Sequence, residues 1–110
     1  MKPMTVAGLA TLMLAATAAR GANAAENWIQ SCASCHGQDG AGKTKIGHKV
    51  GAKDLADAAY QKSFTDAQLF DHLKAGETDA DGKSKMKPFG DKLSDDEIKA
   101  LVGYVRALSK

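Results

Sequence analysis

Cysteine is scarce in this sequence, whose 110 residues include only Cys32 and Cys35. A structural zinc site needs four sulfur or imidazole ligands, and the chain has no second Cys-x-x-Cys pair to complete one. A disulfide across so short a loop would constrain the unfolded chain very little. A thioredoxin-type redox pair requires a βαβ context, and no alternating pattern predicts strands here. These absences leave another role for the cysteine pair.

A histidine directly follows the pair, so residues 32–36 read Cys-Ala-Ser-Cys-His. Cys-x-x-Cys-His is the attachment signature of c-type haem. Two thiols three residues apart lie on one face of a helical turn and can add to the two vinyl groups at one edge of a porphyrin. The imidazole that follows can bind the iron. The motif predicts one covalently attached haem c, held by Cys32 and Cys35, with His36 as an iron ligand.

The N-terminal 24 residues have the pattern of a secretory signal peptide. Lys2 precedes an apolar run over residues 4–19, and Ala22-Asn23-Ala24 fits the small-x-small rule for cleavage after Ala24. The run is shorter than the ~20 apolar residues of a membrane-spanning helix, which argues against the alternative of an uncleaved anchor. We therefore expect residues 1–24 to be removed and residues 25–110 to form one periplasmic domain, without stable membrane insertion.

Neither sign of charge is in excess after this removal. Lys2 and Arg20 leave with the signal peptide, which reduces the 15 basic residues to 13, against 13 acidic ones. Without a basic excess, nucleic-acid binding is not expected. A domain of this size is also near the limit at which an apolar core alone is sufficient, so an attached haem would act as a staple.

Methionine is nearly absent from the mature chain, because three of the four precede residue 24. The one that remains, Met86, can supply the second axial ligand that a six-coordinate haem needs, since a thioether is common in electron carriers. It lies in a lysine-rich loop, where burial would need a reason other than helix packing. We predict Met86 as the distal ligand. The alternatives are His48, expected to be solvated, and His72, expected to be partly buried beside a helix face.

The mature chain otherwise predicts helices joined by loops. A short helix is expected from about Glu26 into the cysteine pair, then a polar loop with several glycines to about Lys53, and a second short helix over residues 54–60. A charged loop is expected over residues 77–92.

Two longer helices have clear start signals. Thr65 with Gln68, and Ser94 with Glu97, each form a capping box. Gly76 is expected to end the first of these helices. The second has the i, i+3, i+4 spacing of a buried stripe, formed by Ile98, Leu101, Val102, Val105 and Leu108.

Two motif matches lack the context that their chemistry requires. Residues 37–44 satisfy the phosphate-loop pattern G-x-x-x-x-G-K-[ST], but the haem motif precedes them where a buried strand is needed, and no helical stripe follows. No nucleotide binding is expected. Glu77, Asp79 and Asp81 resemble the start of a calcium-binding loop, but Pro88 occupies the twelfth position. We expect a solvated turn there.

The chain resembles a class I cytochrome c of the small bacterial, single-haem type. The haem motif, Met86 followed by Pro88 and Phe89, and a last helix with the sequence Leu101-Val102-Gly103-Tyr104-Val105 carry the resemblance over essentially the whole mature chain. It implies an all-α fold of about four short helices wrapped around one covalently attached haem. It also implies His36 as proximal and Met86 as distal ligand, and Trp28 packed on the last helix near Leu101 and Tyr104.

The chain departs from the family pattern at two places. Many members have Pro directly after the ligand Met, whereas Lys87 intervenes here. Many also have a Pro after the haem motif whose carbonyl accepts the ring N–H of the ligand His, and no Pro lies between the signal peptide and Pro88. Another carbonyl, within about residues 45–51, is therefore expected to orient His36.

The aromatic side chains are expected to form the core around the porphyrin, with Trp28, Tyr60 and Tyr104 as alternative hydrogen-bond donors to a haem propionate. The six are Trp28, Tyr60, Phe64, Phe70, Phe89 and Tyr104.

Ligation by both His and Met would leave oxygen and peroxide no open position on the iron, which predicts a one-electron carrier and not an enzyme. A gas- or peroxide-reactive protein with a labile distal ligand, and a dedicated subunit of one enzyme, remain the alternatives. Residues 37–53 and 83–92 each contain four lysines and one acid. We expect a monomer whose cationic rim meets an acidic redox partner, unless these loops are simply solvated. The expected contacts are Lys43, Lys45, Lys49, Lys53, Lys83, Lys85 and Lys87.

Overall fold

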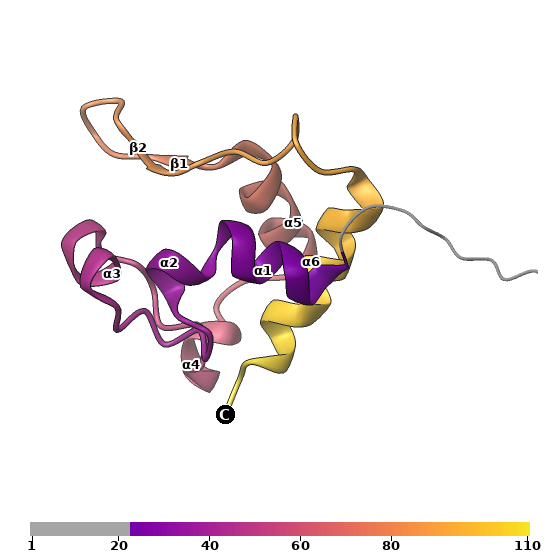
Figure 1. Ribbon diagram of the computed structural model, residues 1–110, viewed down its shortest axis with the longest axis horizontal. Helices are drawn as coiled ribbons and strands as arrows, with labels where there is room; N and C mark the ends of the chain where they lie inside the picture. The colour runs from indigo at the N-terminus through magenta and orange to yellow at the C-terminus, as the bar shows by residue number, and fades with distance from the viewer. Residues whose placement is uncertain (1–22) are drawn as a thin grey trace, which may run out of the picture.

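The computed structural model describes residues 23–110, which form six helical segments and a two-stranded hairpin (Figure 1). The all-α prediction is confirmed, although the described residues form more helical segments than the four or so expected. The helices are α1 (Ala24–Ser31), α2 (Ala33–His36), α3 (Lys45–Val50), α4 (Ala58–Gln61), α5 (Asp66–Ala75) and α6 (Asp95–Ala107), and the strands are β1 (Glu77–Thr78) and β2 (Ser84–Met86).

The core lies where α6 packs against both α1 and α5. The largest fully buried side chains are Trp28 on α1 and Ile98, Leu101 and Val105 on α6. These α6 residues belong to the stripe expected from the sequence, so the apolar spacing did identify the buried face. The centroids of the Trp28 and Tyr104 rings lie 5.3 Å apart, which confirms that Trp28 packs on the last helix.

Both expected capping boxes are present. At the start of α5, the Thr65 amide donates to the Gln68 side chain over 2.8 Å and the Gln68 amide donates to the Thr65 hydroxyl over 3.0 Å. Ser94 and Glu97 make the same pair of bonds at the start of α6. Each cap contributes roughly 1 kcal/mol. Gly76 ends α5 as predicted.

The prediction of a continuous loop up to about residue 53 was wrong in part, because α3 forms within these residues. Thr44 starts α3: its hydroxyl accepts from the Gly47 amide over 2.8 Å and donates to the Cys35 carbonyl over 2.7 Å. A Cβ on Gly47 would collide with the carbonyl oxygens of Cys35 and Gly42. The helix therefore depends on close contact with the cysteine motif. In the described part of the chain before residues 37–44, the elements are the helices α1 and α2, without the buried strand that a phosphate loop needs.

The second short helix, α4, is shorter than expected and is tied to α6. The Gln61 side-chain amide donates to the Val105 carbonyl over 2.8 Å. The Arg106 guanidinium donates to the carbonyls of Gln61 and Phe64 and to the Asp66 carboxylate. These bonds fix the segment between α4 and α5 against the C-terminal helix.

Residues 77–92, expected as a loop, contain the hairpin. Strands β1 and β2 are antiparallel, with Glu77 opposite Met86. The Asp79 side chain accepts from the amides of Asp81 and Lys83, each over 2.9 Å, and so closes an exposed turn as predicted. Residues 23–110 hold no group of three acidic, His or Cys side chains arranged for a metal ion.

The expected signal peptide lies outside the described residues except for its last two positions. Asn23 caps α1 by a capping box with Glu26, and Ala24 is the first residue of the helix. Cleavage after Ala24 would remove this cap. None of the helices within residues 23–110 has the length and apolarity needed to cross a membrane.

Candidate functional site

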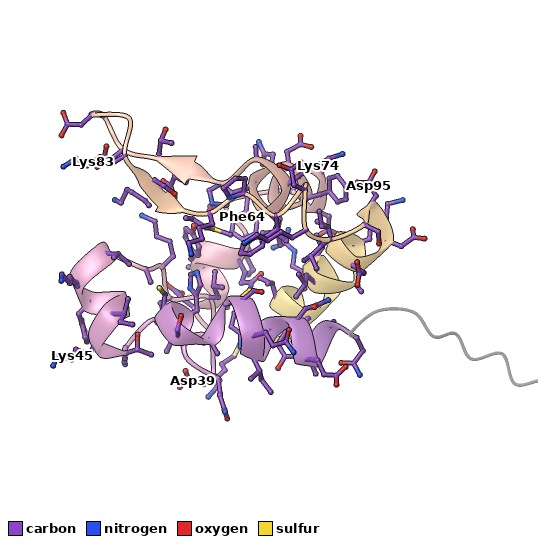
Figure 2. The ribbon with its side chains drawn as sticks, turned by 45° about the horizontal axis from the view of Figure 1, so that its top comes forward. Asp39, Lys45, Phe64, Lys74, Lys83 and Asp95 are labelled. Carbon is purple, nitrogen blue, oxygen red and sulfur yellow. The ribbon has the colours of Figure 1, made fainter. Side chains whose placement is uncertain are left out.

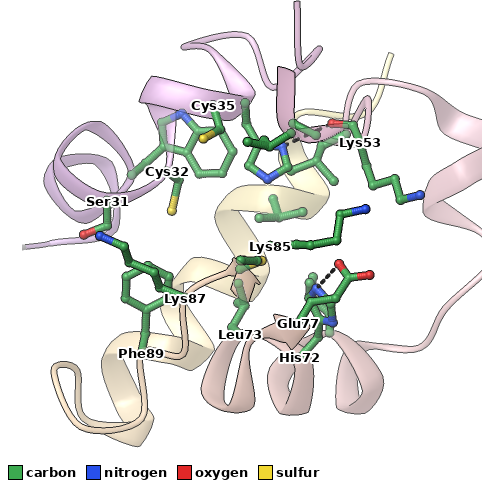
Figure 3. A pocket seen from close by; sticks show the side chains of 18 of the residues that line it. Ser31, Cys32, Cys35, Lys53, His72, Leu73, Glu77, Lys85, Lys87 and Phe89 are labelled. Carbon is green, nitrogen blue, oxygen red and sulfur yellow. Dashed lines mark hydrogen bonds and ion pairs between the residues drawn. The ribbon is translucent and has the colours of Figure 1, made fainter. Parts of the chain in front are cut away.

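A cavity of about 550 Å³ lies between the α1–α2 segment on one side and α5 and the hairpin on the other (Figure 3). Cys32, between α1 and α2, and Cys35 and His36 on α2 line it from one side, and Met86 lines it from β2. The structure thus brings all four residues singled out in the sequence to one cavity. Its apolar walls include Leu55, Leu69, Leu73, Phe89 and Val105.

The imidazole of His36 is held by a main-chain hydrogen bond. Its Nδ1 lies 3.1 Å from the Lys53 carbonyl oxygen. Because a carbonyl can only accept, Nδ1 carries the proton, and Nε2 keeps the lone pair that a metal ligand needs. Burial lowers the pKa of His36, and the bond to Lys53 opposes this shift only in part. The prediction of a carbonyl within residues 45–51 was wrong, because the acceptor belongs to Lys53, two positions further along the chain.

The two cysteines, three residues apart in the sequence, both line the cavity. Cys32 joins α1 to α2 and is buried, Cys35 is half-buried within α2, and neither is in a disulfide. Burial raises the pKa of the Cys32 thiol to about 11, and the neighbouring Cys35 adds to the rise. Cys32 is therefore a neutral thiol at pH 7.

Trp28 packs against the haem motif and hydrogen-bonds to the residue that follows it. Its indole N–H donates to the Gly37 carbonyl over 3.1 Å, and its ring centroid lies 5.9 Å from that of His36. The only donor of this side chain is thereby used within the protein. Trp28 is thus no longer a candidate for binding a propionate.

The Met86 strand is fixed to the end of α5 by main-chain contacts. The Phe89 amide donates to the Leu73 carbonyl over 3.0 Å, and the Gly90 amide donates to the Lys74 carbonyl over 3.1 Å. Gly76, with φ of +75°, lies so close that an added Cβ would be 2.6 Å from the Met86 carbonyl oxygen. Met86 itself is partly buried and packs against the core.

The two alternative histidine ligands occupy different positions. His48 is exposed on α3 and does not line the cavity. His72 is partly buried, as expected, and lines the cavity from α5. Its Nε2 lies 3.7 Å from a Glu77 carboxylate oxygen, so the ring already has a polar partner.

Four of the six aromatic residues line the cavity: Trp28, Tyr60, Phe64 and Phe89. Tyr104 instead packs on Trp28, and Phe70 lies between α5 and α6, beside Lys99 and Val102. The expectation that all six surround a porphyrin was therefore wrong for these two residues.

The expected cationic rim is only partly assembled at the cavity. Lys53, Lys85, Lys87 and Lys92 line it, with Glu77 as the one acidic residue among the described lining residues. Lys43, Lys45, Lys49 and Lys83 are exposed away from it. Figure 2 shows Lys45 on α3 and Lys83 at the hairpin turn, pointing outward on the same side of the molecule.

Residues 18–105 match the model of a family described as cytochrome c oxidase, cbb3-type, subunit III. The chain belongs to this family of c-type cytochromes. Among solved structures, the cytochrome is similar to the KustC0563 c-type cytochrome, with 33% sequence identity and a TM-score of 0.68 over 81% of this chain and 100% of the other. A mutant of that protein matches with 33% identity and a TM-score of 0.67 over 80% of this chain and 100% of the other. No curated protein sequence matches the chain.

Membership of this family means that the cytochrome carries covalently bound haem c with its iron, and serves haem-based electron transfer. The residues at the cavity fit that group. Cys32 and Cys35 are free thiols on one helical turn, His36 keeps Nε2 available, and Met86 offers a thioether from the facing wall. The volume lies within the range of about 300–1,000 Å³ usual for cofactor sites.

Proposed function

We propose that this cytochrome is a one-electron carrier exported to the periplasm. In this proposal Cys32 and Cys35 hold the haem by thioether bonds, and His36 and Met86 bind its iron from opposite faces. The observation that carries the proposal is the placement of an imidazole and a thioether on facing walls of one cavity, with the imidazole already in the tautomer that a metal requires.

A bound haem would take up and release one electron reversibly. The chain's own residues then decide what else can happen at the site. His36 and Met86 would hold the iron between them and so leave oxygen and peroxide no open place to bind. The Lys53 carbonyl and the main-chain bonds to the end of α5 hold the two ligands in place. The apolar walls favour the less charged ferrous state and so raise the reduction potential.

The lysines around the cavity support docking to an acidic redox partner. Four lysines and one acid surround the opening, and three further lysines follow on α3 and in the loop before it. Such a field attracts and orients an acidic surface. The domain itself is proposed to be a monomer that releases its partner after transfer, as expected of a carrier and not of an enzyme.

The name of the matching family supports a second candidate, a dedicated subunit of one enzyme. That name refers to subunit III of a cbb3-type oxidase. Gel filtration of the protein from its native membrane-free and membrane fractions separates the two candidates. A free carrier elutes alone at the size of its own domain, and a dedicated subunit elutes with a larger complex.

The experiment for the leading proposal uses the exported protein made in a host that attaches haem c. We expect haem to remain bound to the chain after denaturation, one equivalent per chain, on the peptide that contains Cys32 and Cys35. The reduced protein should not change its absorption spectrum under carbon monoxide, because Met86 holds the sixth position. Rapid binding of carbon monoxide by the unaltered protein would instead indicate a gas-reactive haem protein.

A further inference from the structure

The cavity has two chemically different ends. Figure 3 shows Cys32 and Cys35 at one end and the amines of Lys53 and Lys85 at the other, above the pair formed by His72 and Glu77. All of these residues line the same cavity. Any ligand held at the cysteines would therefore extend toward the charged end.

Lys85 reaches across the mouth of the cavity at this end. It starts on β2, on the wall that carries Met86, and its Nζ lies 3.9 Å from a Cβ built on Gly51, the residue that ends α3 on the opposite wall. Within residues 23–110, the ion pairs are His72–Glu77, Lys74–Asp95 and Arg106–Asp66. Lys53 and Lys85 thus have no carboxylate partner in the described part of the chain.

Haem has its two vinyl groups and its two propionates on opposite halves of the macrocycle. Attachment of the vinyl groups to Cys32 and Cys35 directs the propionates to the end with Lys53 and Lys85. We propose that Lys85 binds the haem propionates, with Lys53 as a second cation beside it. This inference rests on the proposed attachment at the two cysteines.

The other groups at this end do not supply the charge that a propionate needs. Glu77 carries the wrong charge, and the half-buried His72 faces it at 3.7 Å. Burial and the nearby Glu77 raise the pKa of Tyr60, so this side chain stays a neutral phenol that can donate one hydrogen bond. The indole N–H of Trp28 is already bonded to Gly37. An amine on a flexible stem makes a charge-assisted bond to a carboxylate of roughly twice the strength of a neutral one.

The test compares Lys85→Gln with Lys83→Gln in the haem-loaded protein. Lys83 is the matched control, because it precedes β2, is exposed and does not line the cavity. Proton NMR of the propionate methylene groups, followed against pH, reports directly on the propionates. We expect Lys85→Gln to move their titration upward by about one pH unit or more, and Lys85→Arg to restore it. Lys83→Gln should leave it unchanged. In the reduced unaltered protein, nuclear Overhauser contacts should join the Lys85 ε-protons to these methylenes.

Equal titrations in the Lys85→Gln and Lys83→Gln proteins, together with no contact from Lys85, would overturn the inference. The pyridine haemochrome spectrum and the methionine-to-iron charge-transfer band of each variant are measured on the same samples. If the spectrum shows no haem c on the unaltered chain, the proposed function fails. If haem and the charge-transfer band are normal and only the NMR result is negative, the propionate inference fails alone. A change in partner reaction rate without any NMR change would assign Lys85 to docking.

Discussion

The hydrogen bond from His36 to the Lys53 carbonyl decides which nitrogen of the imidazole can bind a metal. This bond, 3.1 Å long, places the proton on Nδ1. Burial of the ring lowers the pKa of His36, which the bond opposes only in part, and so favours the neutral form. A lone pair on Nε2 is available only in that form. The sequence could name the histidine, because the motif specifies it. It could not name the carbonyl, because a main-chain acceptor has no side-chain signature and its position depends on how α3 packs.

The lowered pKa of His36 predicts a loss of stability on acidification. In the unfolded chain His36 takes up a proton near its ordinary pKa of 6.5, whereas the folded protein resists protonation. The unfolded state therefore binds more protons below that pH, and the free energy of unfolding decreases as pH falls from 6.5 to the lowered pKa of the folded state. In the haem-loaded protein, a bond from Nε2 to iron would also exclude this proton and so keep the same direction. Denaturant unfolding of that protein, measured from about pH 7.5 to about pH 5, should show this decrease.

The exposed His48 provides the control for this titration. Its replacement by Gln removes an imidazole that does not line the cavity, and the decrease assigned to His36 should persist in that variant. A stability that stays flat over this range in the unaltered protein would contradict the assigned role of His36.

The close packing at Gly76 predicts that a single methyl group added there would disturb the Met86 strand. In Gly76→Ala, the Cβ would lie 2.6 Å from the Met86 carbonyl oxygen at a φ of +75°, so either the helix end or the Met86 strand must move. With φ of 75° and ψ of −171°, Gly76 has a backbone conformation essentially restricted to glycine, which alone costs another residue about 1–3 kcal/mol. We expect lower stability and a weakened methionine-to-iron charge-transfer band. Gly103→Ala is the matched control: nothing lies within 4 Å of its added Cβ, and it should raise stability by about 1 kcal/mol. Equal effects of the two changes would contradict this account of the Met86 strand.

Among the elements, those with local start signals were predictable and those held by tertiary contacts were not. The capping boxes of α5 and α6 are written in four consecutive residues each, and both helices begin where these residues indicate. Helix α3 has a glycine in its middle and depends on the bond from Thr44 to the Cys35 carbonyl. Strands of two and three exposed residues are too short to show an alternating pattern, so the hairpin was missed.

Because Asn23 caps α1, the position at which the signal peptide is cleaved should affect the stability of the mature protein. A chain that begins at residue 25 lacks the Asn23 cap and places a charged amine in the first turn of α1, against the helix dipole. It should be less stable by about 1 kcal/mol than a chain that begins at residue 22. The replacement Asn23→Ala in the longer chain should reproduce most of the loss. Intact-mass analysis of the exported protein identifies the natural form, and equal unfolding midpoints for the two lengths would refute the role of the cap.

At the scale of the whole molecule, the sequence could predict the haem-binding residues that line the cavity, but not how the other lining residues are arranged around it. The haem motif and the single remaining methionine named the residues that line it. The fold decides which lysines reach the opening of the cavity. Other lysines lie on the outer surface of α3 and at the hairpin turn. The same dependence separates Phe64 and Phe89, which line the cavity, from Phe70, which does not.

The arrangement of lysines predicts electrostatic steering of the partner. Electron transfer to an acidic redox protein should become slower as ionic strength rises, by roughly tenfold or more over the range in which the Debye length shrinks from ~30 to ~10 Å. Lys87→Glu, at the opening of the cavity, should reduce the rate at low salt. Lys99→Glu, an exposed change on α6 away from the opening, should affect it much less. Stopped-flow kinetics measures both, and a rate indifferent to salt would refute steering.

The central claim, that His36 and Met86 hold the iron between them, is tested most directly by carbon monoxide binding to the reduced Met86→Ala protein. We expect this variant to keep its covalent haem, to lose the methionine-to-iron charge-transfer band when oxidised, and to bind carbon monoxide readily when reduced, whereas the unaltered protein resists it. A Met86→Ala protein whose spectra in both oxidation states and whose resistance to carbon monoxide match those of the unaltered protein would contradict the claim.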